Sequence, residues 1–293
     1  MTHKAGFVNI LGNPNVGKST LMNELVGERL SIITSKSQTT RHRIMGIVNT
    51  EEYQIVFSDT PGVLKPNYKL QEAMLSASKE ALADADVILY VTDLYEKIDK
   101  NEDFLKSVKS ATCPVLIVIN KIDLSNQEQL APIIEGWKTE FPHAETFIIS
   151  ALHKFNVKEL FARIVTLLPE SPPYFEKSAL TNKPMRFFVS EKIREKILLH
   201  YQKEIPYSVE VVVDEYKEET DIVNISAIIY VARDSQKGII IGHQGLSLKR
   251  IGTEARKDLE KFIEKKIFLS MFVKVKKDWR DDNEQLQKFG YNQ

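Results

Sequence analysis

The sequence predicts an α/β domain, with a mostly parallel sheet covered by helices on both faces, followed by a smaller α+β module. Three observations support this fold class. Short apolar strands alternate with helical patterns through residues 1–168, a stretch with four prolines and no periodicity occupies 169–184, and the order of elements changes over 185–293. At 293 residues the chain exceeds the usual size of one domain, so we expect two domains and interpret 169–184 as a linker.

Runs rich in β-branched residues are the predicted strands of the first domain: "FVNIL" (7–11), "IVFS" (55–58), "VILYVT" (87–92), "VLIVIN" (115–120) and "TFIIS" (146–150). Helix-period stretches separate most of them, at 18–26, 69–82, 127–139 and 156–167. Apolar strands that alternate with helices are typical of a parallel sheet buried on both faces.

The predicted elements of the second module are a helix at 186–203, strands at 207–216 and 221–232, a helix leading into "GHQG" (242–245), a basic helix at 246–265 and a strand at 267–276. Their order is α-β-β-α-α-β. Trp279 and the tail after it contain no motif, and we expect them to be peripheral.

The charges of the chain cancel overall, with 40 Lys/Arg and 40 Asp/Glu, but they are unevenly placed. Residues 233–280 carry 13 basic against 6 acidic residues, whereas residues 1–232 carry 26 against 31. A polyanion is therefore expected to dock on the C-terminal third. A solvated basic helix face is the alternative interpretation.

Several features favour a cytoplasmic protein. Cys113 is the only cysteine, which excludes an intramolecular disulfide and fits a reducing compartment. The apolar run in "MTHKAGFVNILG" is too short for a secretory signal. No apolar stretch approaches the roughly 20 residues of a membrane span.

The stretch "GNPNVGKS" (12–19) matches G-x-x-x-x-G-K-[ST] and stands between a predicted strand and a helix start. Its two glycines would let the backbone approach a phosphate, with the amides of roughly 14–19 pointing inward. Lys18 is the candidate partner of the β- and γ-phosphates, and Ser19 the candidate hydroxyl ligand of magnesium. The predicted nucleotide contacts here are Gly12, Asn13, Pro14, Asn15, Val16, Gly17, Lys18, Ser19 and Thr20.

The stretch "NKID" (120–123) follows an apolar strand and predicts the base. Guanine presents an N1–H and an exocyclic amine that the Asp123 carboxylate, which we take to be buried, can accept together. Adenine lacks this pair of donors, so the site selects GTP. Asn120 would tie this loop to the P-loop, and the stem of Lys121 would cover the base. With "SAL" (150–152), the predicted base contacts are Asn120, Lys121, Ile122, Asp123, Ser150, Ala151 and Leu152.

The stretch "DTPG" (59–62) ends a predicted strand. Asp59 would reach magnesium through water, and the Gly62 amide would sense the γ-phosphate. The predicted contacts of this turn are Asp59, Thr60, Pro61, Gly62 and Val63.

The polar stretch "TSKSQTTRHR" (34–43) would order around the γ-phosphate and relax after hydrolysis. Thr40 is the candidate for the second magnesium hydroxyl, with Thr39 as the alternative. The candidate metal ligands are therefore Ser19, Thr40 and Asp59, and the candidate catalytic residues are Lys18, Thr40 and Gly62.

Taken in order, "GNPNVGKS", "QTTRHR", "DTPG", "NKID" and "SAL" resemble the translation-factor class of bacterial GTPases, and within it the GTPases of ribosome assembly. The resemblance covers the whole first domain and implies GTP hydrolysis with Mg²⁺. Val63 stands where Ras-type enzymes carry the glutamine that orients the attacking water, so we expect slow intrinsic turnover.

The resemblance also implies how such a site compensates. Relatives with a hydrophobic residue at this point use water held by the backbone and, in some, a potassium ion, and Asn15 matches the asparagine associated with that ion. Arg41 and Arg43 are candidates for a cation supplied in cis, with simple solvation as the alternative.

The stretch "GIIIGHQG" (238–245) places a G-x-x-G loop between two predicted helices. In an α-β-β-α-α-β unit this loop resembles that of the type II KH fold, which clamps the backbone of about four single-stranded nucleotides. The isoleucines 239–241 would form part of an apolar floor under the bases, and a plain structural turn is the alternative. The predicted RNA contacts are Lys237, Gly238, Ile239, Ile241, Gly242, His243, Gln244, Gly245, Lys249 and Arg250.

The resemblance implies further partners that the residues do not identify. These are the 3′ end of 16S ribosomal RNA and the 30S subunit as ligands, and optional peripheral association with the inner face of the cell membrane. We expect a monomer. "IREK" (193–196) is worded as in those relatives, although Ile193 and Ile197 also fit an ordinary packed helix.

Two alternative functions stay open. One is an RNA-binding module whose GTP domain senses nucleotide and barely hydrolyses it. The other is a cell-cycle or membrane-signalling GTPase whose KH-like domain binds protein.

Overall fold

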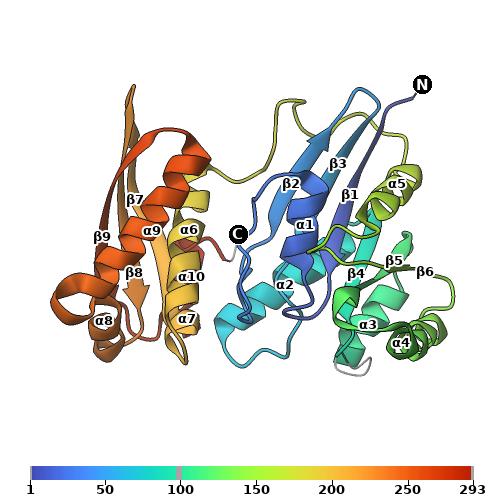
Figure 1. The fold of residues 1–293 in the computed structure, drawn as a ribbon, viewed down its shortest axis with the longest axis horizontal. Coiled ribbons are helices and arrows are strands. Elements are labelled where there is room, and N and C mark those ends of the chain that lie inside the picture. The colour runs from blue at the N-terminus through green and yellow to red at the C-terminus, as the bar shows by residue number, and fades with distance from the viewer. Residues whose placement is uncertain (1, 97–100, 292–293) are drawn as a thin grey trace. The chain divides into compact units, whose positions relative to one another are not determined.

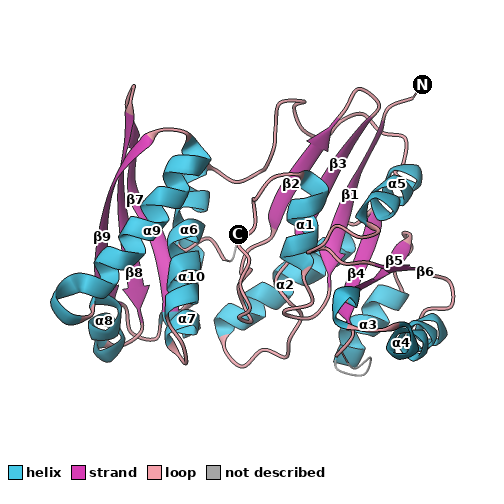
Figure 2. Cartoon of the chain, in the orientation of Figure 1, coloured by secondary structure: helices cyan, strands magenta, loops and turns pink. Residues whose placement is uncertain are grey.

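The computed structural model of the chain describes residues 2–96 and 101–291. The chain forms two compact units, which are considered separately (Figures 1 and 2). The first unit comprises residues 1–67 and 71–182, and the second comprises 68–70 and 183–293. Among the described helices, none is long and apolar enough to cross a membrane.

The first unit contains a six-stranded sheet of order β2-β3-β1-β4-β5-β6. All neighbouring strands are parallel except β2 and β3. The strands are β1 Lys4–Leu11, β2 Ile44–Asn49, β3 Tyr53–Asp59, β4 Val87–Asp93, β5 Val115–Asn120 and β6 Glu145–Ile148. The helices are α1 Lys18–Val26, α2 Lys69–Ala83, α3 Glu102–Lys109, α4 Gln127–Glu140 and α5 Val157–Leu167.

The core of the first unit explains the continuous apolar strands of the sequence. Every residue of β4 is buried, because alternate side chains face opposite helix layers. Ile88 and Tyr90 pack with Phe104 of α3 and Trp137 of α4, in a cluster that also contains Val63. The predicted α/β class with helices on both faces is therefore confirmed, and it brings the carboxyl ends of β1, β3, β4 and β5 to one edge.

Two elements of this unit were not predicted. Strand β2 pairs antiparallel with β3, and it contains Gly46, at which a Cβ would lie 2.7 Å from Val26 Cγ2 of α1. Because β2 contains a glycine and lacks a regular alternation of apolar and polar residues, its sequence alone does not indicate a strand. Its pairing with β3 depends on long-range packing. Helix α3 is only eight residues long, and its register is set by Phe104, Leu105 and Val108, which are buried.

The stretch interpreted as a linker is held against the first unit up to Asn182. The amides of Tyr174 and Phe175 donate to Gln54 Oε1 at 2.7 and 2.9 Å, and the Ile47 amide donates to the Leu180 carbonyl at 2.8 Å. The segment therefore satisfies its backbone through the edge strand β2 and through Gln54, without forming an element of its own.

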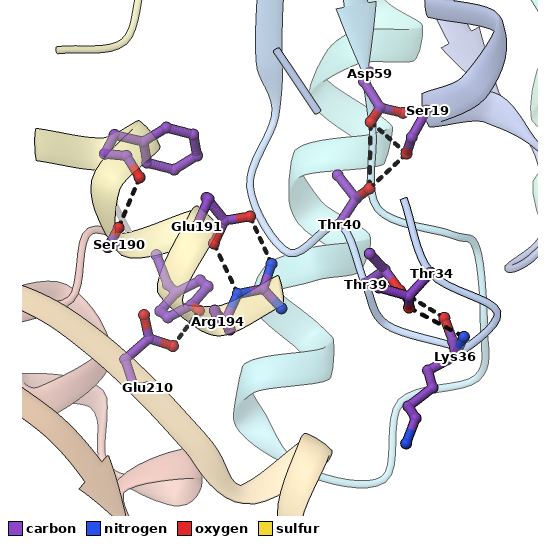
Figure 3. Close-up of polar contacts among 12 residues, drawn as sticks. Ser19, Thr34, Lys36, Thr39, Thr40, Asp59, Ser190, Glu191, Arg194 and Glu210 are labelled. Carbon is purple, nitrogen blue, oxygen red and sulfur yellow. Dashed lines mark hydrogen bonds and ion pairs between the residues drawn. The ribbon is translucent and has the colours of Figure 1, made fainter. Parts of the chain in front are cut away.

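The second unit has the predicted order α-β-β-α-α-β, with two short helices added. Its sheet has the order β7-β8-β9, antiparallel between β7 and β8 and parallel between β8 and β9. The elements are α6 Met185–His200, α7 Ile205–Ser208, β7 Val209–Glu218, β8 Ile222–Val231, α8 Asp234–Ile241, α9 Leu246–Ile263, β9 Lys266–Val275 and α10 Asn283–Lys288. Ile193 and Ile197 of "IREK" are buried in its core, and Arg194 pairs with Glu191 on the same helix at 2.6 Å (Figure 3).

The sequence led us to expect a peripheral tail in the second unit, but the structure shows that the tail is packed. Trp279 is fully buried and its Nε1 donates to the Ser208 carbonyl at 3.1 Å. Leu286 of α10 is also fully buried, and the Tyr291 hydroxyl donates to Glu210 Oε2 at 2.6 Å. A tail that returns to residues about 70 positions earlier leaves no local pattern from which its packing could be predicted.

Candidate nucleotide-binding site and nucleic-acid interface

The P-loop joins the end of β1 to the start of α1, where the fold leaves room only for glycine. Gly12 has φ 142° and Gly17 has φ 97°, both in the region that disfavours other residues. A Cβ at Gly12 would lie 2.1 Å from the Val91 carbonyl oxygen, and one at Gly17 would lie 2.2 Å from Asn120 Nδ2. These glycines are therefore needed for packing inside the protein as well as for close approach to a phosphate.

Lys18 is buried and held by the P-loop itself. Its Nζ donates to the carbonyls of Gly12 at 3.0 Å and Asn13 at 2.7 Å. Burial lowers the pKa of Lys18 to about 8, although the charges of Asp59 and Glu96 act in the opposite direction. The site thus contains a cation that is poorly solvated before any anion arrives.

Three side chains with oxygen donors meet beside the P-loop (Figure 3). Ser19 Oγ lies 2.9 Å from Thr40 Oγ1 and donates to Asp59 Oδ2 at 2.7 Å, and Thr40 Oγ1 donates to the same oxygen at 3.2 Å. Burial raises the pKa of the Asp59 carboxyl, while the Ser19 hydrogen bond and the Lys18 charge act against that rise. An all-oxygen set of two hydroxyls and one carboxylate fits Mg²⁺, a hard cation.

The structure distinguishes Thr40 from its alternative, Thr39. The Thr39 hydroxyl lies 2.6 Å from Thr34 Oγ1 and donates to the Lys36 carbonyl at 2.7 Å, within its own loop (Figure 3). Thr40, not Thr39, is therefore the loop threonine that reaches Ser19 and Asp59.

The two loop arginines are not simply solvated. Arg43 pairs with Asp84 at 2.6 Å and its Nε donates to Ser58 Oγ at 3.1 Å, and Arg41 is almost fully buried. Arg43 therefore fastens the end of the loop to the body of the unit.

Asn120 links three of the predicted motifs. Its Nδ2 donates to the Val16 carbonyl of the P-loop at 2.9 Å, and its Oδ1 accepts from the Ala151 amide at 2.9 Å. Lys121, in the left-handed region with φ 63°, sends Nζ to the Asn15 carbonyl at 2.6 Å and to Asp93 Oδ2 at 2.7 Å. "GNPNVGKS", "NKID" and "SAL" therefore form one bonded assembly.

Asp123 only partly meets the expectation of a buried carboxylate. The residue as a whole is exposed on a short 3₁₀ turn, Ile122–Leu124, but its side chain is only 22% exposed, and its Oδ1 accepts from Ser150 Oγ at 2.6 Å. Its position at the carboxyl end of β5 explains this exposure, because the turn leaves the sheet at once. Leu152 is also strongly exposed. A base bound here would complete the burial of the Asp123 carboxylate.

The "DTPG" turn is packed onto the P-loop. A Cβ at Gly62 would lie 2.6 Å from the Pro14 backbone, and the Val63 amide donates to the Gly12 carbonyl at 3.1 Å. The Val63 side chain is buried in the core cluster, so it points away from a phosphate. Thr60 and Pro61 are anchored in the same way, through hydrogen bonds to the Ile10 carbonyl and from Ser78 Oγ.

Asn13 belongs to a polar cluster that the sequence did not reveal. Its side chain bonds to Glu96 and Asn101, and Asn101 Nδ2 also donates to the Val63 carbonyl at 3.2 Å. Only the backbone of Asn13 faces Lys18, through its carbonyl. No motif signals this cluster, because its members come from three separate loops.

These residues border a pocket of about 370 Å³, within the size range of small-ligand sites. The predicted contacts that line it are Pro14, Asn15, Gly17, Lys18, Ser19, Thr20, Thr40, Thr60, Gly62 and Lys121. The pocket is also lined by residues that the sequence analysis did not name individually as nucleotide contacts: Ile32, Ile33, Thr34, Ser35, Lys36 and Gln38. Ala151 and Leu152 border a smaller cavity of about 290 Å³ that shares Thr20 and Ile33 with the first.

The "GHQG" loop of the second unit is tightly turned. Gly242, Gln244 and Gly245 all have positive φ, at 71°, 49° and 76°. A Cβ at Gly242 would lie 2.2 Å from Ser247 Oγ, whereas one at Gly245 or Gly238 would meet no described atom within 4 Å. Gly242 therefore closes the turn, and Gly245 leaves its outer surface open.

The three isoleucines before the loop do not form a common floor. Ile240 is fully buried in the core, and its carbonyl accepts from the Tyr201 hydroxyl at 2.9 Å. Ile239 is 52% exposed, and Ile241 is half-buried against the core. Successive helical residues point in directions about 100° apart, so three in a row cannot share one face.

A groove of about 400 Å³ runs between α9 and β9 beside this loop. Its lining contains Lys249 and Gly245, and also Gly252, where a Cβ would lie 2.7 Å from Met271 Cε. Arg250 is paired with Glu254 at 3.2 Å. The lining residues that the sequence did not predict are Leu248, Gly252, Thr253, Arg256, Leu269 and Met271. The one signal for them was a glycine inside a helical pattern.

Comparison with known proteins gives matches to both units. Residues 7–121 match the family model described as 50S ribosome-binding GTPase, and residues 204–280 match the KH domain. A structure described as Era in complex with MgGDPNP and nucleotides 1506–1542 of 16S ribosomal RNA has a TM-score of 0.94 at 38% identity, with 99% of each chain covered. A variant of Aquifex aeolicus Era bound to GDP.AlF4- gives the same score and identity, covering 98% of this chain and 99% of that one.

Sequence relatives agree over the full length. The chain is 44% identical over 296 residues to GTPase Era of Carboxydothermus hydrogenoformans, covering 100% of this chain and 99% of that protein. It is 45% identical over 293 residues to GTPase Era of Syntrophus aciditrophicus, covering 99% and 96%. The chain therefore belongs to the GTPase Era family.

Proposed function

We propose that this chain is a GTP-hydrolysing molecular switch that binds the single-stranded 3′ end of 16S ribosomal RNA and assists maturation of the 30S subunit. The observation that carries the proposal is the presence, in one chain, of an oxygen cluster beside a P-loop and a tight G-x-x-G loop beside an open groove. A similar solved structure that holds both MgGDPNP and 16S RNA nucleotides supports it.

The nucleotide site holds phosphates through backbone amides and one lysine. The amides at the start of α1 face the pocket, and Lys18 supplies a positive charge to the β- and γ-phosphates. On binding, Lys18 exchanges two carbonyl partners for anionic ones, so its low pKa rises and its charge is satisfied. Asp123 accepts from the guanine N1–H and exocyclic amine, and Asn120 keeps that loop in register with the P-loop.

Ser19, Thr40 and Asp59 are the residues that would hold magnesium. When bound, the ion neutralises charge on the β- and γ-phosphate oxygens. Because Thr40 lies on the loop 34–43 while Ser19 and Asp59 are fixed by α1 and β3, the site couples the order of this loop to the nucleotide.

Hydrolysis on this site is expected to be slow. Val63 is buried in the core and cannot orient water, so backbone groups at Gly62 must do so. Asn15 lines the pocket and is the proposed partner of a potassium ion. This ion would supply a positive charge near the phosphates that Arg43, paired with Asp84, does not.

The second unit binds the RNA backbone at the "GHQG" loop, with Lys237 and Lys249 nearby and bases in the groove between α9 and β9. The description of the matched GTPase family refers to binding of the 50S ribosomal subunit, whereas the similar solved structure contains 16S ribosomal RNA. We follow the latter because it covers both units, and the family model covers only the first.

Two measurements test the proposal. Phosphate release from GTP is measured with and without a single-stranded 16S 3′-end oligonucleotide, and RNA crosslinked to residues 237–250 is sequenced. We expect slow release and enrichment of the 16S 3′ end. Tight GTP binding without turnover under either condition would favour a nucleotide-sensing RNA module, and an absence of crosslinked RNA would favour a protein-binding role.

We further propose that the protein acts in the cytoplasm as a monomer, with peripheral association at the inner face of the membrane as an additional location. Analytical ultracentrifugation tests the first point, and co-sedimentation with anionic vesicles tests the second.

A further inference from the structure

Strand β9 is an edge strand with two different faces. In the order β7-β8-β9 it has a neighbour on one side only. Its side chains alternate, so Leu269 and Met271 line the groove under α9 while Phe268 and Phe272 point to the opposite face. Phe268 is 61% and Phe272 56% exposed, which is unusual for two phenylalanines on one strand.

The same face carries positive charge at both ends. Lys266 and Lys274 share the alternation of the phenylalanines and are exposed. Neither lysine forms an ion pair with the residues that the structure describes. The cross-strand neighbours on β8 are Asn224 beside Phe268 and Ile228 beside Phe272, neither of them charged.

We propose that the outer face of β9, defined as Lys266, Phe268, Phe272 and Lys274, is a second RNA-binding surface that stacks unpaired bases. The inference rests on the proposed RNA binding of this unit and extends it beyond the groove. Exposed aromatic side chains beside lysines are the combination with which proteins bind single-stranded nucleic acid, the rings taking bases and the ammonium groups phosphates.

The spacing of the rings favours unpaired, splayed bases. Four residues along a strand span about 13 Å, far more than the roughly 3.4 Å between stacked neighbours in a duplex. The two phenylalanines would therefore hold bases that are not adjacent, with the backbone running between Lys266 and Lys274.

The position of β9 makes the two RNA surfaces continuous. One face of this strand borders the groove and the other carries the phenylalanines, so a chain leaving the groove reaches the outer face by crossing a single unpaired edge. The local excess of basic residues in 233–280 favours a polyanion as the ligand of this face. A protein with few acidic residues, or a second copy of this chain, would match that charge less well. An exposed edge with apolar rings is also a hazard unless a ligand covers it.

The test compares two RNAs on the full-length protein. A tetranucleotide matches the groove alone, and a dodecanucleotide that extends the same 16S 3′-end sequence can reach the outer face. Phe268→Ala/Phe272→Ala should weaken dodecanucleotide binding by about 5- to 100-fold per stacked base and leave the tetranucleotide unchanged. Leu199→Ala, a similarly exposed (54%) apolar residue on α6, should change neither affinity. Phe272→Trp alone should keep the wild-type affinity for the dodecanucleotide, because tryptophan also stacks on a base, and its fluorescence should be quenched by the longer RNA.

The outcomes separate this inference from the proposed function. A wild-type protein that does not bind the tetranucleotide contradicts RNA binding at the groove. A wild type that binds both RNAs equally, or a double variant that keeps full dodecanucleotide affinity, overturns the second surface. A double variant that instead changes the sedimentation of the RNA-free protein overturns it too, in favour of self-association through β9. Thermal unfolding of the double variant should match wild type, since both rings are exposed.

Discussion

The two glycine loops of this chain begin helices in the same way but are built for different ligands. Helix α1 starts after Gly17 and helix α9 after Gly245, and both glycines have left-handed backbone conformations. The first turn of neither helix contains an acidic residue. Both helix starts can therefore offer free amides and the positive end of the helix dipole to an anion.

The surroundings of the loops differ. At the P-loop both glycines are packed against protein atoms and the lysine is buried, so the loop has one shape and one depth. At "GHQG" only Gly242 is packed, and Gly245, Gln244 and Leu246 open outward. A closed loop suits one small ligand in one geometry, whereas an open loop suits the repeated backbone of a polymer.

The largest effect should follow from removing the buried cation of the first loop. Lys18→Ala should lower GTP turnover at least about 10³-fold, because the β- and γ-phosphates lose their point charge. Lys249→Ala, at the second loop, should weaken RNA only a few-fold, since one phosphate contact among several is lost. Single-turnover phosphate release and RNA titration measure the two effects. Comparable losses would contradict the distinction between a closed and an open site.

A second change concerns base selection. Asp123→Asn should weaken GTP binding about 10²-fold or more and favour xanthosine triphosphate, because the amide can donate to the O2 of xanthine where the carboxylate accepted from guanine. Competition binding with GTP, ATP and xanthosine triphosphate measures this. Equal affinity of the unmutated protein for ATP and GTP would contradict base recognition at Asp123.

The open loop should tolerate charge without unfolding but lose its ligand. His243→Asp/Gln244→Asp places two carboxylates where phosphates approach, and we expect RNA affinity to fall about 10- to 100-fold, with a shallower dependence on salt. Stability should change by about 0.5 kcal/mol or less per substitution, and GTP binding should be unchanged. A double variant that binds RNA like wild type in a salt titration would make "GHQG" only a turn.

The two glycines of the second loop offer an internal comparison. Gly242→Ala forces a Cβ to 2.2 Å from Ser247 Oγ at φ 71°, so it should destabilise the second unit by about 3 kcal/mol. Gly245→Ala meets open space and should cost only about 1 kcal/mol, the penalty of a left-handed alanine. Urea denaturation measures both. Equal costs would mean that the loop is not closed by Gly242.

What the sequence predicted correctly was local, and what it missed depends on distant packing. "GNPNVGKS" and "NKID" are readable because each string lies between a strand and the next element, where strand ends converge. The burial of Ile240 and the return of Trp279 to Ser208 depend on how elements far apart in the chain meet. The groove at Gly252 and Met271 likewise requires α9 and β9 to be placed first. The sequence motifs therefore predicted the type of ligand, but not the residues outside the motifs that line the pocket and the groove.

The smallest effect is the pH dependence that the buried lysine gives to the first loop. In the protein without nucleotide Lys18 has a pKa of about 8, below the ordinary lysine value of 10.5, so between these values the unfolded chain holds a proton that the native protein lacks. The charge of Lys18 thus weakens the nucleotide-free fold below pH 8, and stability contributed by this group rises as pH increases from 8 to 10.5. Phosphates favour the charged form, so nucleotide binding above pH 8 should take up a proton and weaken by up to about tenfold per pH unit. Calorimetry in two buffers of different ionisation enthalpy at pH 8.5 measures the uptake, with Lys18→Ala as the control that should show none. Proton uptake by the Lys18→Ala protein would contradict the assignment to this buried amine.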